Sequence, residues 1–197
     1  MARLEVITGP MFSEKSTELI RRVRRAMYGK KEVLVIKPEI DKRTGKEIAS
    51  RKKKDKSCDK FEQSESIPAH SVKSFNDIKK LVDGNTINLL AIDEAQFFEP
   101  WLVDAIRELL EIHESDDFVI AVAGLDMDYE QKPFGSMPLL MTLADIVLKL
   151  TAVCFKCGQD ANLTYLKRNV GRPEGQILIG NFETYEARCR PCHKLSD

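Results

Sequence analysis

The stretch Gly9-Pro10-Met11-Phe12-Ser13-Glu14-Lys15-Ser16 decides the fold, because it joins a strand pattern to a helical pattern. Leu4-Glu5-Val6-Ile7 before it is a short apolar run, and apolar residues recur at helical spacing from Ser16 to Met27. The eight residues resemble the phosphate-loop pattern G-x-x-x-x-G-K-[ST], in which backbone N–H groups curl around phosphates at a helix N-terminus. In that pattern the lysine neutralises phosphate charge and the hydroxyl binds Mg²⁺. Residues 9–16 are therefore expected to bind a nucleoside triphosphate with Mg²⁺.

Glu14 departs from this pattern, because glycine is expected at its position. A carboxylate there stands close to a polyphosphate, and a side chain removes the backbone freedom of glycine. Two outcomes are open: either the side chain points to solvent and the loop keeps its shape, or the affinity for nucleotide is reduced. Without the pattern, the same residues would form an ordinary strand–turn–helix connection.

A second acidic site, Asp93-Glu94-Ala95-Gln96-Phe97-Phe98, follows the apolar run Leu89-Leu90-Ala91-Ile92. An apolar strand ending in Asp is the Walker B arrangement, in which the carboxylate binds the Mg²⁺ shell beside the phosphate loop. The adjacent Glu94 could accept a proton from an attacking hydroxyl. Taken alone, either carboxylate could instead cap the following turn. Together with the phosphate loop they predict one ligand site at the carboxyl edge of a sheet.

The remaining patterns alternate apolar strands with helices, which predicts an α/β domain of the P-loop NTPase type. Its mostly parallel sheet should be covered by helices on both faces. Further strands are expected at 33–36, 118–123 and 146–150, and helices at 75–81 and 100–112. Residues 42–66 are polar and lysine-rich, and predict a mobile loop or an exposed hairpin. We assign this ATP-binding domain to residues 1–150.

Four cysteines form two Cys-x-x-Cys pairs after residue 150: Cys154 with Cys157, and Cys189 with Cys192. This spacing suits a tetrahedral Zn²⁺ site, and four protein ligands leave no open position for substrate, so the site should be structural. Two disulfides or free thiols are the alternative, which the absence of a secretory leader disfavours. We expect a small zinc-binding module at residues 151–197.

The charge balance bears on partners, because Lys plus Arg equals Asp plus Glu at 31 each. A net charge of zero gives no overall field that attracts nucleic acid or an anionic membrane. No apolar run approaches the roughly 18 residues of a membrane span, and no leader precedes the first strand. We therefore expect a cytoplasmic protein, with neither a membrane nor nucleic acid as a partner.

Together these motifs resemble the zinc-containing type II thymidine kinases, in the order in which that family carries them. The likeness rests on residues 9–19, Asp41-x-Arg43, Asp93-Glu94-x-Gln96-Phe97-Phe98, Gly124-Leu125-Asp126, Lys132-Pro133-Phe134-Gly135 and the cysteine pairs. The resemblance implies transfer of the γ-phosphoryl group of ATP to the 5′-hydroxyl of thymidine, in deoxynucleoside salvage for DNA synthesis. It further implies Mg²⁺ with ATP, structural Zn²⁺, a homotetramer and feedback inhibition by thymidine triphosphate.

The resemblance also assigns roles to single residues. Glu94 matches the general base for the 5′-hydroxyl, Asp93 matches the carboxylate beside Mg²⁺, and Gln96 belongs with the ATP and Mg²⁺ ligands. The nucleoside pocket is expected to include Met11, Phe97, Leu125, Tyr129 and Phe134, with Ile179, Gly180, Asn181 and Tyr185 in a closing loop at 179–185. That loop reads the base through backbone hydrogen bonds, and the metal anchors it. Arg43 and Lys132 should face the phosphates or shape the lid.

Four positions depart from the family pattern: Glu14 and Asn181 replace glycines, Tyr129 replaces Phe, and His193 replaces Tyr. We expect the fold to survive all four changes, whereas Glu14 brings the turnover rate into question. Two other functions therefore stay open. One is a degenerate relative that binds nucleotide with impaired turnover. The other is a zinc-ribbon P-loop ATPase acting on nucleic acid, which would need a basic stripe with interleaved aromatic residues, and the sequence has none.

Overall fold

A six-stranded sheet with strand order β5-β2-β6-β7-β1-β8 forms the centre of the protein. The computed structural model describes residues 1–53, 61–83, 85–113, 117–167, 180 and 182–194. All neighbouring strands of this sheet run parallel. The strands are β1 (Arg3–Thr8), β2 (Val33–Pro38), β5 (His70–Val72), β6 (Leu89–Ile92), β7 (Val119–Gly124) and β8 (Ile146–Lys149). Five of them confirm the predicted strands. The sixth, β5, was not predicted, because three residues carry no readable apolar pattern.

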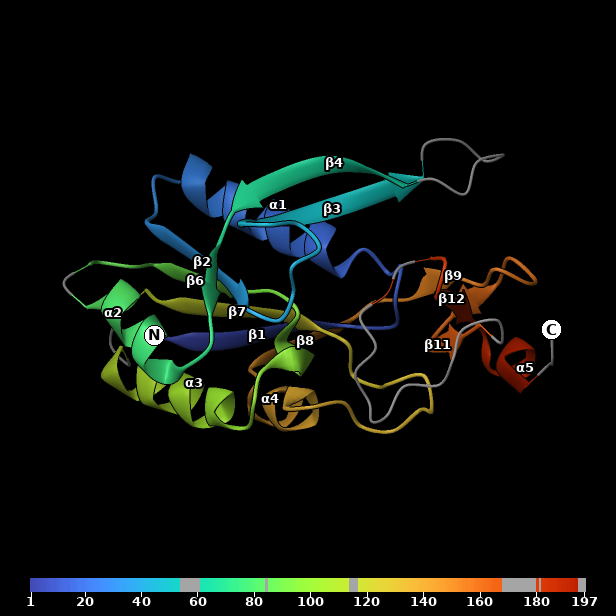
Figure 1. Cartoon of the computed structure of the whole chain (residues 1–197). Coiled ribbons are helices and arrows are strands. Elements are labelled where there is room, and N and C mark those ends of the chain that lie inside the picture. The colour runs from blue at the N-terminus through green and yellow to red at the C-terminus, as the bar shows by residue number, and fades with distance from the viewer. Residues whose placement is uncertain (54–60, 84, 114–116, 168–179, 181, 195–197) are drawn as a thin grey trace.

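Helices cover both faces of this sheet, as predicted (Figure 1). On one face lies α1 (Lys15–Tyr28), which buries Leu19, Ile20 and Val23 against the strands. The antiparallel hairpin of β3 (Glu47–Lys53) and β4 (Phe61–Pro68) packs on α1 and buries Ile48 and Ile67, so residues 42–66 contain a hairpin, and its described base is packed rather than exposed. The opposite face is covered by α2 (Phe75–Val82), α3 (Trp101–Ile112) and α4 (Met137–Leu143).

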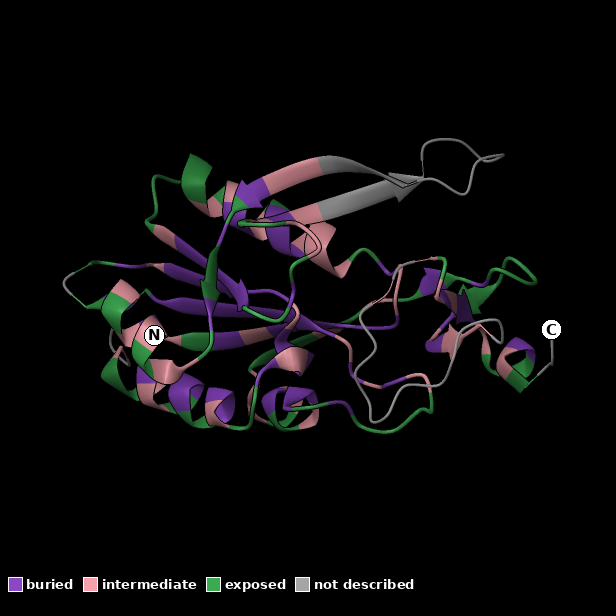
Figure 2. Ribbon diagram, in the orientation of Figure 1, coloured by how far each residue is buried: buried purple, intermediate pink, exposed green. Residues whose placement is uncertain are grey.

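The sequence explains why these helices form where they do. Ser74 and Asp77 form a capping box that starts α2, since each side chain satisfies a backbone N–H of the first turn. In α3, Leu102, Ile106 and Leu109 are spaced at three to four residues and face the core. Figure 2 shows the result: buried residues concentrate in the sheet and on the helix surfaces turned toward it.

The C-terminal part is built from short elements with a core of its own. These are β9 (Ala152–Val153), β10 (Asp160–Ala161), β11 (Leu163–Leu166), β12 (Tyr185–Arg188) and α5 (Arg190–Lys194). Strand β9 pairs with β10, and β11 with β12, both antiparallel. Ala152, Cys154, Ala161, Ala187 and Cys192 form its small core. The cysteine cluster in this part completes the predicted fold class, while the boundary at residue 150 stays a prediction. None of the helices in the described part of the chain has the length and apolar character required to span a membrane.

Candidate active site and metal centre

The phosphate-loop motif and the acidic motif meet at one edge of the sheet. Strand β1 ends at Thr8 and β6 ends at Ile92, with β7 between them. The hydroxyl of Ser16, in the first turn of α1, donates to both carboxylate oxygens of Asp93, at 3.0 Å to Oδ2 and 3.3 Å to Oδ1. A hydroxyl beside a carboxylate is the donor set that Mg²⁺ takes in phosphate-loop proteins.

The backbone of residues 9–16 adopts unusual dihedral angles. Gly9 has φ 142°, and a Cβ there would collide with the carbonyl oxygen of Leu150, so only glycine fits. Phe12 and Glu14 both adopt the left-handed region, with φ 66° and 61°. Glu14 therefore takes the conformation that glycine would adopt freely, at a strain cost on the order of 1–3 kcal/mol. Its side chain is exposed and forms no cap hydrogen bond with α1. Of the two outcomes left open by the sequence, the structure favours the carboxylate that points to solvent.

Two ionisable groups at this edge have displaced pKa values. Burial lowers the pKa of Lys15 to about 8, although the charges of Glu94 and Asp93 oppose the change. Burial and the charge of Glu94 raise the pKa of Asp93 to about 7, against the hydrogen bond from Ser16. The ammonium of Lys15 donates to the carbonyl oxygen of Pro10 at 2.7 Å, within the loop itself. A bound triphosphate would add negative charge beside Lys15, and a divalent cation would add positive charge beside Asp93, which favours the charged form of each group.

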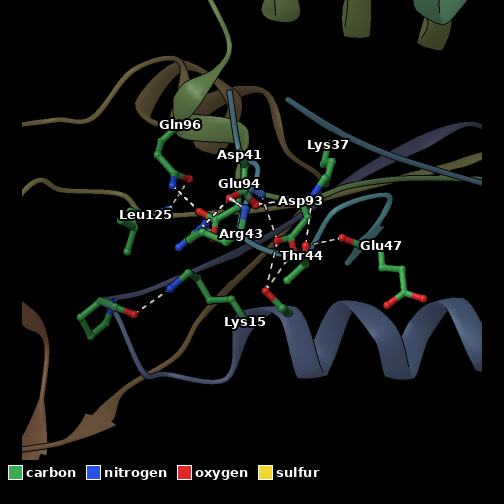
Figure 3. A network of polar contacts seen from close by, with 12 residues as sticks. Lys15, Lys37, Asp41, Arg43, Thr44, Glu47, Asp93, Glu94, Gln96 and Leu125 are labelled. Atoms are coloured by element: carbon green, nitrogen blue, oxygen red, sulfur yellow. Dashed lines mark hydrogen bonds and ion pairs between the residues drawn. The ribbon is translucent and has the colours of Figure 1, made fainter. Parts of the chain in front are cut away.

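Glu94 presents its carboxylate from a strained backbone between β6 and the short helix η1 (Ala95–Phe97). Its φ of 52° and ψ of 41° are left-handed, a conformation that persists in non-glycine residues only when the surroundings impose it. One carboxylate oxygen, Oε1, pairs with the guanidinium of Arg43, and the other, Oε2, accepts a hydrogen bond from Nε2 of Gln96 at 2.5 Å (Figure 3).

Gln96 is fixed by protein groups at both ends of its amide. While Nε2 donates to Glu94, Oε1 accepts from the backbone N–H of Leu125 at 3.0 Å. Glycines make room for this arrangement: a Cβ at Gly124 would lie 2.8 Å from Oε1 of Gln96, and one at Gly135 would collide with the Gln96 carbonyl oxygen. The sequence placed Gln96 with the ATP and Mg²⁺ ligands, whereas its contacts in the structure are with Glu94 and Leu125.

Interactions are seen within two groups of the expected nucleoside residues: Phe97 with Phe134, and Tyr185 with Tyr129. The rings of Phe97 and Phe134 meet edge to face, with centroids 5.8 Å apart. Tyr185 is buried, and burial together with the charges of Tyr129 and Asp128 raises its pKa to about 12.

The structure describes only part of the expected closing loop at 179–185, and it places Lys132 on the surface. Ile179 and Asn181 lie outside the described residues. Gly180 is so close to Thr184 that a Cβ would lie 2.6 Å from Oγ1. Lys132 pairs with Glu130 at 2.7 Å on the exposed surface, so the structure does not bring it to the phosphate loop.

The four paired cysteines converge, as the sequence predicted. Their sulfur atoms all lie within 4.8 Å of one another, and Sγ of Cys157 is 3.6 Å from Sγ of Cys189. A tetrahedral site with Zn–S bonds of about 2.3 Å needs sulfurs about 3.8 Å apart, so the cluster fits Zn²⁺. Despite burial, backbone N–H groups of Cys189, Cys157 and Lys156 lower the pKa of Cys154 to about 6, whereas side-chain hydrogen bonds with Cys189 and Cys157 raise the pKa of Cys192 to about 12.

The thymidine kinase family model matches residues 2–193. This chain belongs to the thymidine kinase family. A curated thymidine kinase from Coprothermobacter proteolyticus is 42% identical over 202 aligned residues, which cover 98% of this chain and 90% of the relative. The resemblance read from the motifs is thereby confirmed, and the chain is a kinase.

One part of the site in this thymidine kinase family member was not assigned from the sequence. Lys37, at the end of β2, is fully buried, and its ammonium donates to Oγ1 of Thr44 at 2.9 Å and lies 3.9 Å from Asp41. Asp41 in turn pairs with Nε of Arg43 at 2.6 Å, which lowers the pKa of Asp41 although burial opposes the change. The available signal was a lysine directly after the apolar run 33–36, at the same sheet edge as Asp93.

Proposed function

We propose that this protein transfers the γ-phosphoryl group of ATP to the 5′-hydroxyl of thymidine, with the residues of the sheet edge in the roles given below. The contact of Ser16 with Asp93, directly beside Glu94, carries the proposal. It puts a site for a divalent cation next to a carboxylate at the end of the same strand. Phosphoryl transfer to a hydroxyl needs a cation at the phosphates and a base at the hydroxyl. The two must be close enough for the reacting phosphate and hydroxyl to reach both.

The phosphate loop holds ATP in this proposal. Backbone N–H groups of Phe12 to Ser16, at the N-terminus of α1, would face the phosphates, with Lys15 neutralising their charge, while the Met11 N–H donates to Thr164. Lys15 leaves the Pro10 carbonyl oxygen when a phosphate oxygen offers a charged acceptor, since hydrogen bonds between charged groups are stronger. Ser16 and Asp93 would hold the Mg²⁺, which would supply positive charge to stabilise the phosphates during transfer.

Glu94 is the proposed general base. It takes the proton of the 5′-hydroxyl as that oxygen forms a bond to the γ-phosphorus, and the bond to the bridging oxygen breaks to release ADP. Each oxygen of Glu94 accepts one hydrogen bond in the structure and keeps a second lone pair for the substrate. Gln96 then acts as a positioning residue for Glu94, and Arg43 is the second cation available to the transferring phosphoryl group.

We assign the nucleoside side of the site to the aromatic pair Phe97 and Phe134, together with Met11, Leu125, Tyr129 and Tyr185. Aromatic faces suit a planar base, and polar groups such as the Tyr185 hydroxyl can fix the orientation of the base through hydrogen bonds. We include Ile179, Gly180 and Asn181 in the loop that closes over thymidine. The four cysteines would hold Zn²⁺, whose bonds fix the short elements to which this loop is attached.

We also infer a homotetramer and a cytoplasmic location. Strand β8 lies at the edge of the sheet, where Ile146 and Val147 are 48% and 42% exposed. Strand β8 pairs with β1 on one side and has no neighbour on the other among the described strands, and apolar side chains on such an edge favour association with another chain. The use of ATP and four reduced thiols suited to zinc fit a reducing, ATP-containing compartment.

A single assay tests the proposed reaction. The purified protein is incubated with ATP labelled at the γ-position, Mg²⁺ and thymidine, and a parallel reaction contains DNA instead of thymidine. Labelled thymidine monophosphate is the expected product, and DNA should not stimulate release of phosphate. DNA-dependent ATP hydrolysis would indicate the nucleic-acid ATPase instead. No product in either reaction, with ATP still bound, would indicate a degenerate relative.

A further inference from the structure

The cysteine-bearing module contacts the phosphate loop directly. The backbone N–H of Met11 donates to Oγ1 of Thr164, on β11, at 3.0 Å. The ring of Phe12 lies 5.5 Å from that of Phe155, between the first two cysteines, and packs against the small core that contains Cys154 and Cys192. Two consecutive residues of the loop are thus held by the module, across 153 and 143 positions of sequence.

Thr164 is itself fixed from the cysteine side. It is 5% exposed, and β12 pairs with it at Ala187, two residues before Cys189. Its carbonyl oxygen lies 3.1 Å from Nε2 of His193, which follows Cys192 in α5. Thr164 is thus linked to the second cysteine pair through Ala187 on one side and His193 on the other.

The contact matters because affinity for phosphate depends on where the loop N–H groups point. The hydrogen bond with Thr164 turns the Met11 N–H toward the module, and the next residue, Phe12, adopts the left-handed region at φ 66°. That conformation costs energy in a non-glycine residue and persists only when neighbours impose it. Two residues of the module contact them: Thr164 accepts from Met11, and the ring of Phe155 lies against that of Phe12.

We propose that Thr164 is a positioning residue for the phosphate loop, so that the metal-binding module sets the affinity for ATP as well as anchoring the closing loop. This inference rests on the proposed function, because it assumes that residues 9–16 bind ATP. It gives the metal centre a role on the phosphate-donor side of the reaction. The module then orders both substrate sites through one set of short strands.

The test compares Thr164→Val with Thr164→Ser. Valine keeps the shape and removes the acceptor, whereas serine keeps the hydroxyl. The dissociation constant of a non-hydrolysable ATP analogue with Mg²⁺ is measured by calorimetry without thymidine, and zinc content by chelator release. We expect binding to weaken about 5- to 10-fold in Thr164→Val, since an N–H has lost its partner, and to stay within about 2-fold of wild type in Thr164→Ser. Zinc content should stay equal in all three proteins.

A second variant covers the case in which Thr164→Val loses zinc or fails to fold. Phe155 is 43% exposed, so Phe155→Ala should fold, and it should weaken binding of the analogue about 2- to 3-fold by releasing Phe12. Unchanged affinity in a zinc-loaded Thr164→Val or Phe155→Ala protein would overturn the inference, as would equal losses in Thr164→Val and Thr164→Ser. If the wild-type protein bound no analogue at all, the proposed function would fail and the inference with it.

Discussion

Arg43 pairs with Glu94, the carboxylate proposed as general base, and is held there by Asp41. The charges of Glu94 and Asp41 raise the pKa of Arg43 although burial opposes the change, so the guanidinium stays charged. An arginine paired with the general base orients its carboxylate, and it also competes with the substrate hydroxyl for the carboxylate oxygens. When ATP brings phosphate oxygens to this edge, Arg43 gains a third anionic partner beside Glu94 and Asp41, and can share its donors among them.

Glu94→Gln should keep the fold and the binding of ATP but lower kcat about 100-fold or more, because the amide cannot accept the proton of the 5′-hydroxyl. Turnover is measured by thymidine monophosphate formation, and ATP binding by calorimetry. Glu99→Gln, an exposed substitution five residues along the chain, is the matched control and should leave kcat unchanged. Near-normal turnover in Glu94→Gln would remove Glu94 from the reaction.

Gln96→Leu should lower kcat about 10-fold and leave the KM for ATP within about 2-fold, because the lost hydrogen bond orients Glu94 rather than holding nucleotide. The split between kcat and KM distinguishes this role from the ATP and Mg²⁺ role assigned from the sequence. A large rise in the KM for ATP or in the Mg²⁺ requirement, with kcat preserved, would restore that assignment. Circular dichroism and the zinc content check that the variant is folded.

Glu14→Gly should raise the free energy of unfolding by about 1 kcal/mol and change ATP affinity little. Glycine adopts φ 61° without strain, and the carboxylate that it removes is exposed to solvent. Urea denaturation measures the stability. Glu14→Ala separates the two causes, since alanine removes the charge but keeps the strained backbone. If both variants bound ATP more tightly, the carboxylate would have to face the nucleotide.

The sheet edge at which the motifs meet could be predicted from local sequence patterns, whereas the order of the strands in the sheet could not. Residues 9–16 and Asp93 each follow an apolar run, and parallel strands bring their carboxyl ends to one edge. The cysteine spacing likewise predicted the cluster. The short strand β5 and helix α4 were missed, the second because Pro138 and a run of apolar residues hide the helical period.

The side-chain hydrogen bonds that position the site residues could not be predicted from local sequence patterns. The amide of Gln96 bridges Glu94 and Leu125, and Thr164 holds Met11, through hydrogen bonds between segments far apart in sequence. Such contacts leave no periodic pattern, because each depends on one donor and one acceptor placed by the whole fold. The buried Lys37 was missed for the same reason: its partners Thr44 and Asp41 lie in a loop without a regular pattern.

The affinity for ATP with Mg²⁺ should be highest between about pH 7 and about pH 8. Burial and the charge of Glu94 raise the pKa of Asp93 to about 7, and binding of Mg²⁺ needs the carboxylate, so affinity falls as the pH drops below that value. Burial lowers the pKa of Lys15 to about 8, and a phosphate needs the ammonium, so affinity also falls as the pH rises above that value.

Calorimetry at several pH values, in buffers of different ionisation enthalpy, counts the protons exchanged on binding of the non-hydrolysable analogue with Mg²⁺. We expect proton release on the acidic side, where Asp93 must ionise, and proton uptake on the basic side, where Lys15 must be charged. Lys15→Arg should remove the basic fall, because arginine stays charged, and Asp93→Asn should remove the acidic fall, which separates the protein groups from titration of the ligand. Wild-type affinity that stays flat across this range would show that neither group changes protonation when the nucleotide binds.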